Sequence, residues 1–345
     1  MANLAVAGVC NLRCPYCFAG SYLAVSRDHS TAFIDMATFE QRLDFLARSG
    51  IPEARLIGGE PTLHPDFPAL VAAARARGLR ISVFSHGLMP RRALDCLAAL
   101  PADACAVLVN MNAGRAAGAN PAELDRRRAT LKRLGPRATP GFTIYRPDFE
   151  LADLLSIVLD TGCRPAIRLG LAQPMLAGGN AYLHPKQYPA AGARIAAFAC
   201  DAAAAGVALQ FDCGFVRCMF SDGDIEMLGR AGSDFACRCS PILDLDLAGM
   251  ASHCFPLTGI VQTPIGEGEA AGALREALAG QTVPYRLAGI YPRCSSCGEK
   301  ARGACTGGCL AATMRRFRGG PLRAVVPTTR LPTDNSTMIQ EGEAR

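Results

Sequence analysis

Short apolar stretches alternate with amphipathic segments along the first two hundred residues. The apolar stretches are typical of strands, and the segments between them repeat apolar residues at helical spacing. The pattern predicts strands at residues 4–9, 54–57, 80–84, 104–111, 142–145 and 166–171. It predicts helices at residues 38–49, 66–77, 91–100, 122–134 and 149–160, the first capped by Thr38 and Gln41. Alternation of this kind predicts an α/β fold with a parallel sheet covered by helices.

Three cysteines follow the first predicted strand. Cys10, Cys14 and Cys17 have the spacing C-x3-C-x2-C, and the aromatic Phe18 comes directly after the last of them. Three such thiolates can hold three irons of a cubane iron–sulfur cluster and leave the fourth iron open, whereas a ferredoxin supplies four cysteines. Structural zinc is the alternative, but it requires four ligands, and no fourth cysteine comes before residue 96. The spacing therefore favours an iron–sulfur cluster with an open iron.

A glycine turn follows the second predicted strand. Gly58, Gly59, Glu60 and Pro61 stand where an apolar run ends, and glycine allows unusual backbone dihedral angles and close approach of a ligand. Glu60, beside exposed backbone carbonyls, is suited to accept hydrogen bonds from an ammonium group. Both motifs follow strands of a parallel sheet, so we expect them to lie together at its C-terminal edge.

Together, the cysteine loop and this turn resemble the signature of the radical S-adenosylmethionine (radical SAM) enzymes. The resemblance implies a partial (β/α)6 TIM-like barrel with its active site at the C-terminal ends of the strands. It implies a [4Fe–4S] cluster on Cys10, Cys14 and Cys17 whose open iron binds SAM, and contacts from Gly58–Pro61 to the SAM amino group. One electron, from an external donor such as flavodoxin or ferredoxin, would cleave SAM to a 5′-deoxyadenosyl radical that abstracts a substrate hydrogen.

Polar residues at other strand ends are weaker candidates. Ser85 ends the third strand and Asn110 the fourth, where their side chains could hold the ribose and the methionine carboxylate of SAM. Arg168 on the sixth strand could meet a carboxylate of SAM or substrate, or form a structural ion pair. For each of the three, an ordinary structural role is equally consistent with the sequence. The histidines are not favoured as acid–base groups, because hydrogen abstraction needs no side-chain base.

The C-terminal third is rich in cysteine. Two blocks stand out: Cys239 to Cys254 reads C-x9-G-x4-C around a predicted hairpin, and Cys294 to Cys309 reads C-x2-C-x7-C-x3-C. They resemble the SPASM domain, which holds two auxiliary [4Fe–4S] clusters in many radical SAM enzymes. This chain has seven residues where the family's pattern has five, and no cysteine follows Cys309. The seventh ligand of the pattern is therefore missing.

Carried over residue by residue, the SPASM pattern implies one auxiliary cluster on Cys239, Cys254 and Cys309. Its fourth ligand would be Cys237 or Cys218. The assignment joins the last cysteine of the second block to the first block, as in the family.

The same pattern implies another auxiliary cluster on Cys294, Cys297 and Cys305. Its fourth position is open to Cys213, Cys218, a non-cysteine group or substrate. The alternative for this region is one structural zinc ribbon, whose ligands would be Cys294, Cys297, Cys305 and Cys309.

Composition fits an enzyme of the cytoplasm. The formal net charge of +6 over 345 residues is mild and forms no basic stripe, which disfavours nucleic acid as a partner. No apolar run reaches membrane-spanning length, and no signal peptide is evident. The 16 cysteines of a cytoplasmic chain are better explained by metal clusters than by disulfides, because cytosolic thiols stay reduced.

We therefore expect a barrel at residues 1–204, a SPASM-like domain at 205–320 and a flexible tail at 321–345. The predicted activity is radical SAM modification of a peptide (RiPP-type) or protein. Oxidation or rearrangement of a small-molecule metabolite is the alternative, favoured modestly because the first strand begins so early that a leader-peptide-binding domain has no room before it. A non-catalytic iron–sulfur or zinc protein is the remaining interpretation.

Overall fold

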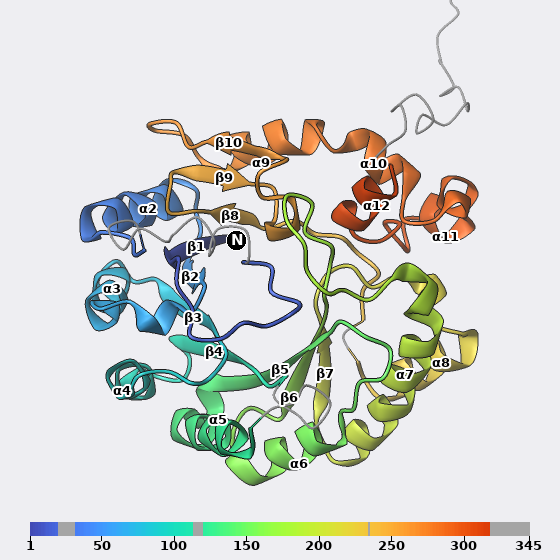
Figure 1. The fold of residues 1–345 in the computed structure, drawn as a ribbon, viewed down its shortest axis with the longest axis horizontal. Helices are drawn as coiled ribbons and strands as arrows, with labels where there is room; N and C mark the ends of the chain where they lie inside the picture. Colours follow the sequence, from blue (N-terminus) through green and yellow to red (C-terminus); the bar gives the residue numbers. More distant parts are fainter. Residues whose placement is uncertain (20–31, 113–119, 234, 318–345) are drawn as a thin grey trace, which may run out of the picture.

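The computed structural model describes residues 1–19, 32–112, 120–233 and 235–317. In these residues one ten-stranded sheet has the order β10-β9-β8-β1-β2-β3-β4-β5-β6-β7. The strands from β1 to β7 are parallel and curve into an open ring with helices outside it (Figure 1). The fold is a partial TIM-like barrel, as the alternating pattern predicts.

All six strands predicted from the apolar pattern are present in the sheet. The barrel strands are β1 (Ala2–Ala7), β2 (Glu53–Gly58), β3 (Arg80–Ser85), β4 (Cys105–Asn110), β5 (Ala138–Ile144), β6 (Ala166–Leu171) and β7 (Ala208–Phe211). The helices between them are α2 (Met36–Arg48), α3 (Phe67–Ala76), α4 (Arg91–Ala99), α5 (Pro121–Leu134), α6 (Ala152–Thr161) and α7 (Tyr188–Ala204). Strand β7 was not predicted: it is short and only one of its four residues is buried, so it carries little apolar signal.

Helix α2 illustrates why these segments become helices. Phe39, Leu43 and Leu46 lie on one face and are fully buried against the sheet. The predicted cap is wrong: Asp35, not Thr38, is the N-cap, and its carboxylate accepts a hydrogen bond from the backbone N–H of Thr38 at 2.8 Å. The helix starts earlier than its apolar period suggests because an aspartate three residues upstream satisfies its first free N–H groups.

The C-terminal region joins the opposite edge of the barrel sheet. Strand β8 (Leu243–Leu245) pairs in parallel with β1, and β9 (Met250–Ser252) and β10 (Gln262–Pro264) add antiparallel strands. The predicted hairpin is thus confirmed as β8 and β9. The sheet runs on both sides of the predicted domain boundary at residue 204, so that boundary stays a prediction. The predicted tail at 321–345 lies outside the described residues.

Buried polar residues tie β8 to the barrel. Asn3 on β1 donates a hydrogen bond to the Asp244 carboxylate, and the Arg55 guanidinium donates to the Asn3 side-chain oxygen at 2.9 Å. Asp244 is completely enclosed, and its pKa is raised because burial disfavours the charged carboxylate. This network fixes the hairpin against β1 through side chains as well as backbone bonds.

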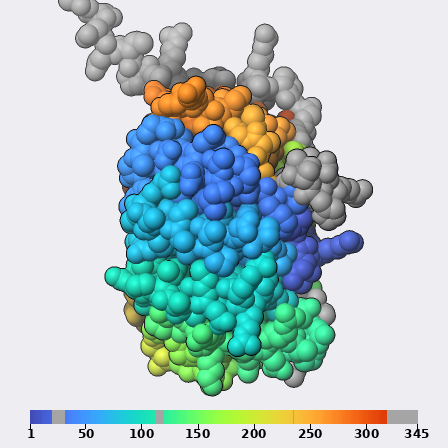
Figure 2. Space-filling model, turned by 90° about the vertical axis from the view of Figure 1, so that its left-hand side faces the viewer, coloured from blue at the N-terminus to red at the C-terminus, as the bar shows by residue number. Residues whose placement is uncertain are grey.

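The remaining helices close the ring beside the hairpin. They are α8 (Asp222–Arg230), α9 (Ala271–Gly280), α10 (Val283–Ala288), α11 (Gly298–Ala301) and α12 (Leu310–Arg316). Figure 2 shows the orange residues around α9 lying above the blue residues of α2, and the backbone N–H of Ala271 donates to the Ser49 hydroxyl at 2.9 Å. Among the helices of the described residues, none is long and apolar enough to cross a bilayer.

Candidate metal centres

The loop after β1 carries the three closely spaced cysteines into the centre of the ring (Figure 1). A tight turn forms where the Cys17 N–H donates to the Cys14 carbonyl at 3.1 Å, and the Leu12 N–H donates to the Cys10 sulfur at 3.4 Å. Burial, together with the Glu60 carboxylate and the other two thiols, raises the pKa of the Cys10 thiol to about 11. The three sulfurs therefore lie near one another and near the glycine turn. This donor set suits three irons of a cubane cluster.

Loops from distant strands hold this cysteine loop in place. The Tyr16 hydroxyl donates to the Asn110 side-chain oxygen at 3.4 Å, and the Tyr16 ring lies 4.9 Å from the Tyr145 ring. After β6, the Ala181 N–H donates to the Pro15 carbonyl at 2.7 Å, and the Asn180 amide donates to the Tyr16 carbonyl at 3.3 Å. The cysteine loop is thereby positioned by the C-terminal ends of β4, β5 and β6.

The glycine turn after β2 is pressed directly against the start of the cysteine loop. A Cβ at Gly58 would lie 2.2 Å from the Ala7 carbonyl oxygen, and the φ of this residue is 151°. The Gly59 N–H donates to the Ala7 carbonyl at 2.7 Å, and the Glu60 N–H donates to the Val9 carbonyl at 2.8 Å. Only glycine permits this approach, so the turn and the cysteine loop form one unit.

The carboxylate of Glu60 faces protein donors. It is fully buried, and one oxygen accepts hydrogen bonds from the Thr62 hydroxyl at 2.6 Å and the Thr62 N–H at 3.2 Å. The other oxygen accepts from the His86 N–H at 3.0 Å. The Glu60 carboxylate is thus held by protein donors on both oxygens. Its contact with a ligand ammonium stays a prediction.

His86 connects the two motifs, which sequence reasoning did not foresee. Its Nδ1 accepts a hydrogen bond from the Leu88 N–H at 3.0 Å, so its proton resides on Nε2. That Nε2–H lies 2.7 Å from the side-chain oxygen of Asn11 in the cysteine loop and 3.2 Å from the Glu60 carboxylate. Burial, more than any other factor, lowers the pKa of His86, so the ring is neutral near pH 7. Its position directly after the third strand was the only signal in the sequence.

The weaker candidates have structural partners. The Ser85 hydroxyl accepts a hydrogen bond from the Gly87 N–H at 3.0 Å. The Asn110 side chain accepts from the Asn112 N–H at 2.9 Å and donates to the Thr143 hydroxyl at 3.2 Å. Both residues lie at the C-terminal ends of their strands, and Asn110 also receives the Tyr16 hydrogen bond. Their side chains order the strand ends around the cysteine loop.

Arg168 pairs with an acid from the next strand. Its Nε donates to the Asp212 carboxylate at 2.9 Å, and the two form an ion pair. The guanidinium also lies 5.8 Å from the Phe84 ring centroid inside the barrel. Of the two roles that the sequence left open, these contacts correspond to the structural ion pair.

The first C-terminal group unites cysteines from four segments. Its members are Cys213, Cys239, Cys254 and Cys309. The Gly214 N–H donates to the Arg238 carbonyl at 3.2 Å, and a Cβ at Gly214 would lie 3.7 Å from the Cys309 Cβ. Burial first, and then the thiols of the other members together with the Asp244 carboxylate, raise the pKa of Cys254. Cys213 therefore lies where the sequence placed Cys237 or Cys218 as the completing ligand.

The second group surrounds a small cavity. Cys218, Cys294, Cys297 and Cys305 all line it. Cys237 lies beside this group: it forms a β-bridge with Cys305, and its thiol hydrogen-bonds to the Cys305 sulfur. That hydrogen bond is the main cause that lowers the pKa of Cys305, to about 5. Cys309 is not among the residues that line this cavity.

The predicted zinc ribbon does not coincide with either cysteine group. In residues 1–19, 32–112, 120–233 and 235–317, no three His, Cys, Asp or Glu side chains converge closely enough for one metal ion. A zinc ion holds its sulfurs at about 2.3 Å from the metal, whereas a cubane cluster spreads its ligands over several ångströms. The predicted zinc ribbon would also need Cys309, which groups with Cys239 and Cys254 instead. The fourth cysteine of that ribbon therefore lies with the other group.

An aromatic contact connects the two cysteine regions. The Phe18 ring, directly after Cys17, lies 4.5 Å from the ring of Phe255, directly after Cys254.

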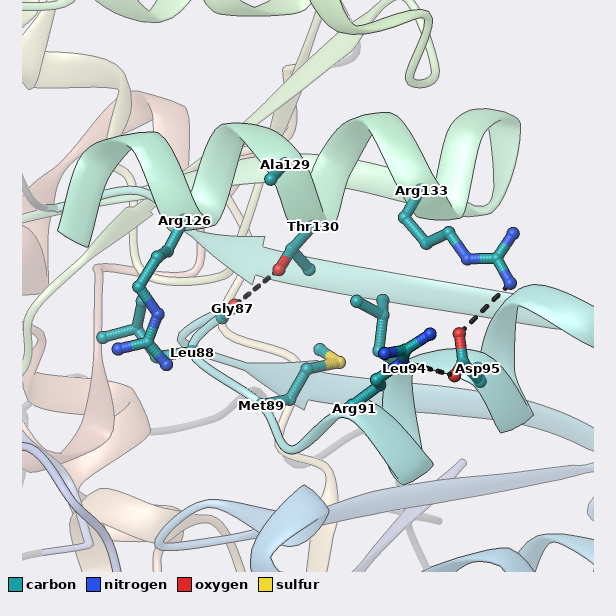
Figure 3. A pocket seen from close by; sticks show the side chains of 10 residues that line it. All are labelled: Gly87, Leu88, Met89, Arg91, Leu94, Asp95, Arg126, Ala129, Thr130 and Arg133. Carbon is teal, nitrogen blue, oxygen red and sulfur yellow. Dashed lines mark hydrogen bonds and ion pairs between the residues drawn. The ribbon is translucent and has the colours of Figure 1, made fainter. Parts of the chain in front are cut away.

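A cavity of about 510 Å³ lies elsewhere, between α4 and α5. Figure 3 shows Arg133 paired with Asp95 and the Thr130 hydroxyl hydrogen-bonded to the Gly87 carbonyl at this cavity. No cysteine lines that cavity, so it is separate from the candidate centres.

Comparison with protein families identifies the barrel. Residues 4–140 match the model of the radical SAM superfamily, and they include the cysteine loop and the glycine turn. This segment is a radical SAM domain. Members of the family are enzymes that use SAM and a [4Fe–4S] cluster, and the sequence-based recognition of the family is confirmed.

Two curated relatives resemble part of the chain. GTP 3′,8-cyclase of Chlorobaculum tepidum is 35% identical over 97 residues, which is 28% of this chain and 28% of the relative. PqqA peptide cyclase of Xanthomonas campestris pv. campestris is 39% identical over 79 residues, which is 23% of this chain and 20% of the relative. The chain thus spans between a fifth and little more than a quarter of the length of these relatives.

Solved structures share the fold over most of the chain. AnSMEcpe with bound AdoMet and Kp18Cys peptide matches with a TM-score of 0.63 at 16% identity. The match covers 92% of this chain and 90% of the anSMEcpe chain. Streptococcus suis SuiB bound to the precursor peptide SuiA matches with a TM-score of 0.64 at 16% identity. The match covers 91% of this chain and 72% of the SuiB chain. The likeness includes the C-terminal region, so the whole described fold has counterparts among solved proteins.

Proposed function

We propose that this radical SAM domain belongs to an enzyme that binds SAM at a [4Fe–4S] cluster held by Cys10, Cys14 and Cys17. Reductive cleavage of SAM there would supply a 5′-deoxyadenosyl radical that abstracts a hydrogen atom from the substrate. The observation that carries the proposal is the direct backbone pairing between the cysteine loop and the Gly58–Pro61 turn. Because this pairing joins the glycine turn to the loop with three cysteines, it supports a shared SAM site.

Individual residues have defined tasks in this proposal. Gly58 and Gly59 expose backbone to the SAM amino group, and Glu60 holds that turn rigid through Thr62 and His86. Tyr16 and Asn110 keep the cysteine loop at the strand ends. These residues prearrange the site, so that little ordering remains when SAM binds.

We further propose that the C-terminal cysteines hold two auxiliary [4Fe–4S] clusters. Cys213, Cys239, Cys254 and Cys309 form one complete set of four thiols, and Cys294, Cys297 and Cys305 belong to the other. Such clusters accept an electron from a substrate radical after hydrogen abstraction, which makes a net oxidation possible. The first electron would come from an external donor such as flavodoxin or ferredoxin.

A peptide or protein is the proposed substrate class. Support comes from the fold, which is shared over about nine tenths of this chain with two proteins whose structures contain bound peptides. One relative that matches part of this chain is a peptide cyclase. The second candidate is a small metabolite, because another partial relative is a cyclase of GTP.

The test begins with anaerobic reconstitution with iron and sulfide. The protein is then given SAM and dithionite, and 5′-deoxyadenosine is quantified by mass spectrometry. We expect 5′-deoxyadenosine from the unmodified protein and none from a variant with Cys10, Cys14 and Cys17 all changed to Ala. The variant should retain the iron of the auxiliary clusters.

Two outcomes would contradict the proposal. Absence of 5′-deoxyadenosine from a fully iron-loaded protein, assayed with and without a panel of peptides and nucleotides, would exclude SAM cleavage and favour an electron carrier. Loss of all iron in the triple variant would exclude auxiliary clusters while leaving SAM chemistry intact. Deoxyadenosine formation stimulated by peptides but not nucleotides would decide between the two substrate classes.

A further inference from the structure

The second cysteine group combines one block of sequence with a cysteine from far upstream. Cys294, Cys297 and Cys305 belong to the C-terminal block, and Cys218 lies on the short 3₁₀ helix η6 (Arg217–Met219) after β7. All four side chains line the same small cavity. Four thiols around one space is the ligand number of a fully coordinated [4Fe–4S] cluster.

The 3₁₀ helix that carries Cys218 is held firmly in place. A Cβ at Gly192 on α7 would lie 2.0 Å from the Met219 carbonyl oxygen, so η6 packs against bare backbone of that helix. The Arg217 guanidinium donates to the Phe220 carbonyl at 2.9 Å and forms an ion pair with Asp222. Because both the residue before Cys218 and the residue after it are fixed, Cys218 faces the cavity as part of a rigid scaffold.

Positive groups surround this cavity. Arg217, Arg293 and Lys300 line it together with the four cysteines, and the Arg293 guanidinium hydrogen-bonds to the Cys218 sulfur. The Gly307 N–H donates to the Cys305 sulfur at 3.4 Å. A cluster held by four thiolates is anionic, and cationic side chains and N–H···S hydrogen bonds stabilise it.

Cys237 is the competing candidate for the fourth ligand, but its contacts suit another role. It does not line the cavity, and its side chain is hydrogen-bonded to the sulfur of Cys305. The Thr306 N–H donates to the Cys237 carbonyl at 3.0 Å, which fixes the Cys237 backbone beside Cys305. A thiol in this position modulates a ligand instead of binding iron itself.

We propose that Cys218 is the fourth ligand of the second auxiliary cluster, with Cys294, Cys297 and Cys305, and that Cys237 lies outside the ligand set, beside Cys305. The proposal rests on the proposed function in one respect, since it requires that this group hold a cluster. It replaces the downstream cysteine that this chain lacks with an upstream one. All four irons are then coordinated by protein, so this cluster transfers electrons and does not anchor substrate.

The experiment uses the full chain with Cys10, Cys14 and Cys17 changed to Ala, so that only auxiliary clusters contribute. In this background we compare Cys218→Ala, Cys237→Ala and the matched control Cys200→Ala, which removes an exposed cysteine on α7 that lines neither group. Iron and acid-labile sulfide are counted per chain, and reduced samples are examined by EPR with and without added 2-mercaptoethanol. Circular dichroism checks that each variant is folded.

We expect about eight irons in the background protein and in Cys200→Ala, from two [4Fe–4S] clusters. Cys218→Ala should lose about four irons, or keep a cluster whose EPR spectrum changes when the added thiol binds the opened iron. Cys237→Ala should keep its iron, and its reduction potential should fall because a hydrogen bond to a ligand sulfur is lost.

Full iron in Cys218→Ala, with an EPR spectrum insensitive to added thiol, would overturn the assignment. Loss of a cluster in Cys237→Ala would overturn it as well, since Cys237 would then be required for ligation. An iron-free background protein would instead refute the auxiliary clusters of the proposed function. The last outcome can be distinguished from the other two because it is measured in the background protein, before Cys218 or Cys237 is changed.

Discussion

The cysteine loop of the barrel and the cysteine groups of the C-terminal region are built in opposite ways. Cys10, Cys14 and Cys17 lie on one loop, and their spacing alone brings three sulfurs together. The C-terminal groups collect cysteines from separate segments between residues 213 and 309, placed by β7, η6, the β8–β9 hairpin and α12. A local motif can be recognised from spacing, whereas a dispersed site depends on the sheet that carries its parts.

The difference also has an energetic side. Bringing three ligands of a short loop together costs little loop-closure entropy. The dispersed groups assemble only after long segments of chain have been ordered, which costs more entropy. The pairing of β8 with β1 and the Asn3–Asp244 hydrogen bond stabilise the ordered C-terminal segments and so offset this entropy loss. We therefore expect the C-terminal groups to be more sensitive to loosening of the fold than the barrel loop is.

The largest expected effect separates the chemistry of the two regions. Cys14→Ala should reduce 5′-deoxyadenosine formation by at least about 100-fold, equivalent to about 2.7 kcal/mol, because the cluster loses one of three ligands. Cys213→Ala should reduce it less than about tenfold, while removing the iron of one auxiliary cluster. Initial rates with dithionite and iron counts measure both. An equal loss of SAM cleavage in the two variants would contradict the different roles given to the cysteine loop and the C-terminal cysteines.

Glycine substitutions should damage each region separately. In Gly58→Ala the new Cβ would lie 2.2 Å from the Ala7 carbonyl oxygen, and in Gly289→Ala it would lie 2.5 Å from the Cys294 Cβ. Each should lose about 1–3 kcal/mol of unfolding free energy from overpacking, in addition to backbone strain. Gly58→Ala should impair SAM cleavage, and Gly289→Ala should impair iron binding by the second group.

Gly78→Ala is the matched control for these substitutions. Its φ is 73°, but a Cβ there would have no neighbour within 4 Å, so only backbone strain of about 1–2 kcal/mol is expected. Thermal unfolding measures all three variants. If Gly58→Ala were no less stable than Gly78→Ala, the close contact between turn and cysteine loop would be refuted.

A smaller effect concerns the contact between the two regions. The Phe18 and Phe255 rings lie 4.5 Å apart, and an aromatic pair contributes about 0.5–1.5 kcal/mol beyond its buried area. A double-mutant cycle with Phe18→Ala and Phe255→Ala, measured by urea unfolding, should give a coupling energy in this range. Simple additivity would mean that the regions are not energetically linked through these rings.

The smallest effect is a pH dependence at the hairpin. Burial raises the pKa of Asp244, so the folded protein keeps a proton that the unfolded chain releases. The stability contribution of this group therefore falls as pH rises from the unfolded pKa of about 3.8 towards the folded pKa. Asp244→Asn does not titrate, so its stability relative to the unmodified protein should increase between about pH 5 and about pH 8. Urea unfolding at both values tests this, and a constant difference would contradict it.

Much of the barrel could be predicted from the chain alone. The strand at residues 166–171 coincides with β6, and the other predicted strands and helices agree with the structure to within about four residues at either end. Apolar periodicity sufficed because each of these segments buries one face or both faces against its neighbours. Helix α7 and strand β7 were not predicted. Strand β7 was not predicted because an edge strand buries little apolar surface. Its pairing with β6 is specified by the sheet and not by its own residues.

The roles of Glu60 and His86 could not be predicted. Spacing indicated that the glycine turn belongs beside the cysteine loop, and the backbone bonds agree. It could not indicate that the Glu60 carboxylate turns towards Thr62 and His86, since the latter comes from the next strand. Side-chain direction at a strand end depends on what the neighbouring strand offers.

The sequence by itself determined the alternating barrel and the cysteine loop, because both are encoded by residues near one another along the chain. Only the tertiary structure decided which C-terminal cysteines meet. It brought Cys213 to the group of Cys309, Cys218 to the group of Cys294, and Cys237 beside Cys305. Cysteines separated by long stretches of chain have no preferred partner until sheet pairing and helix packing fix the distances between them.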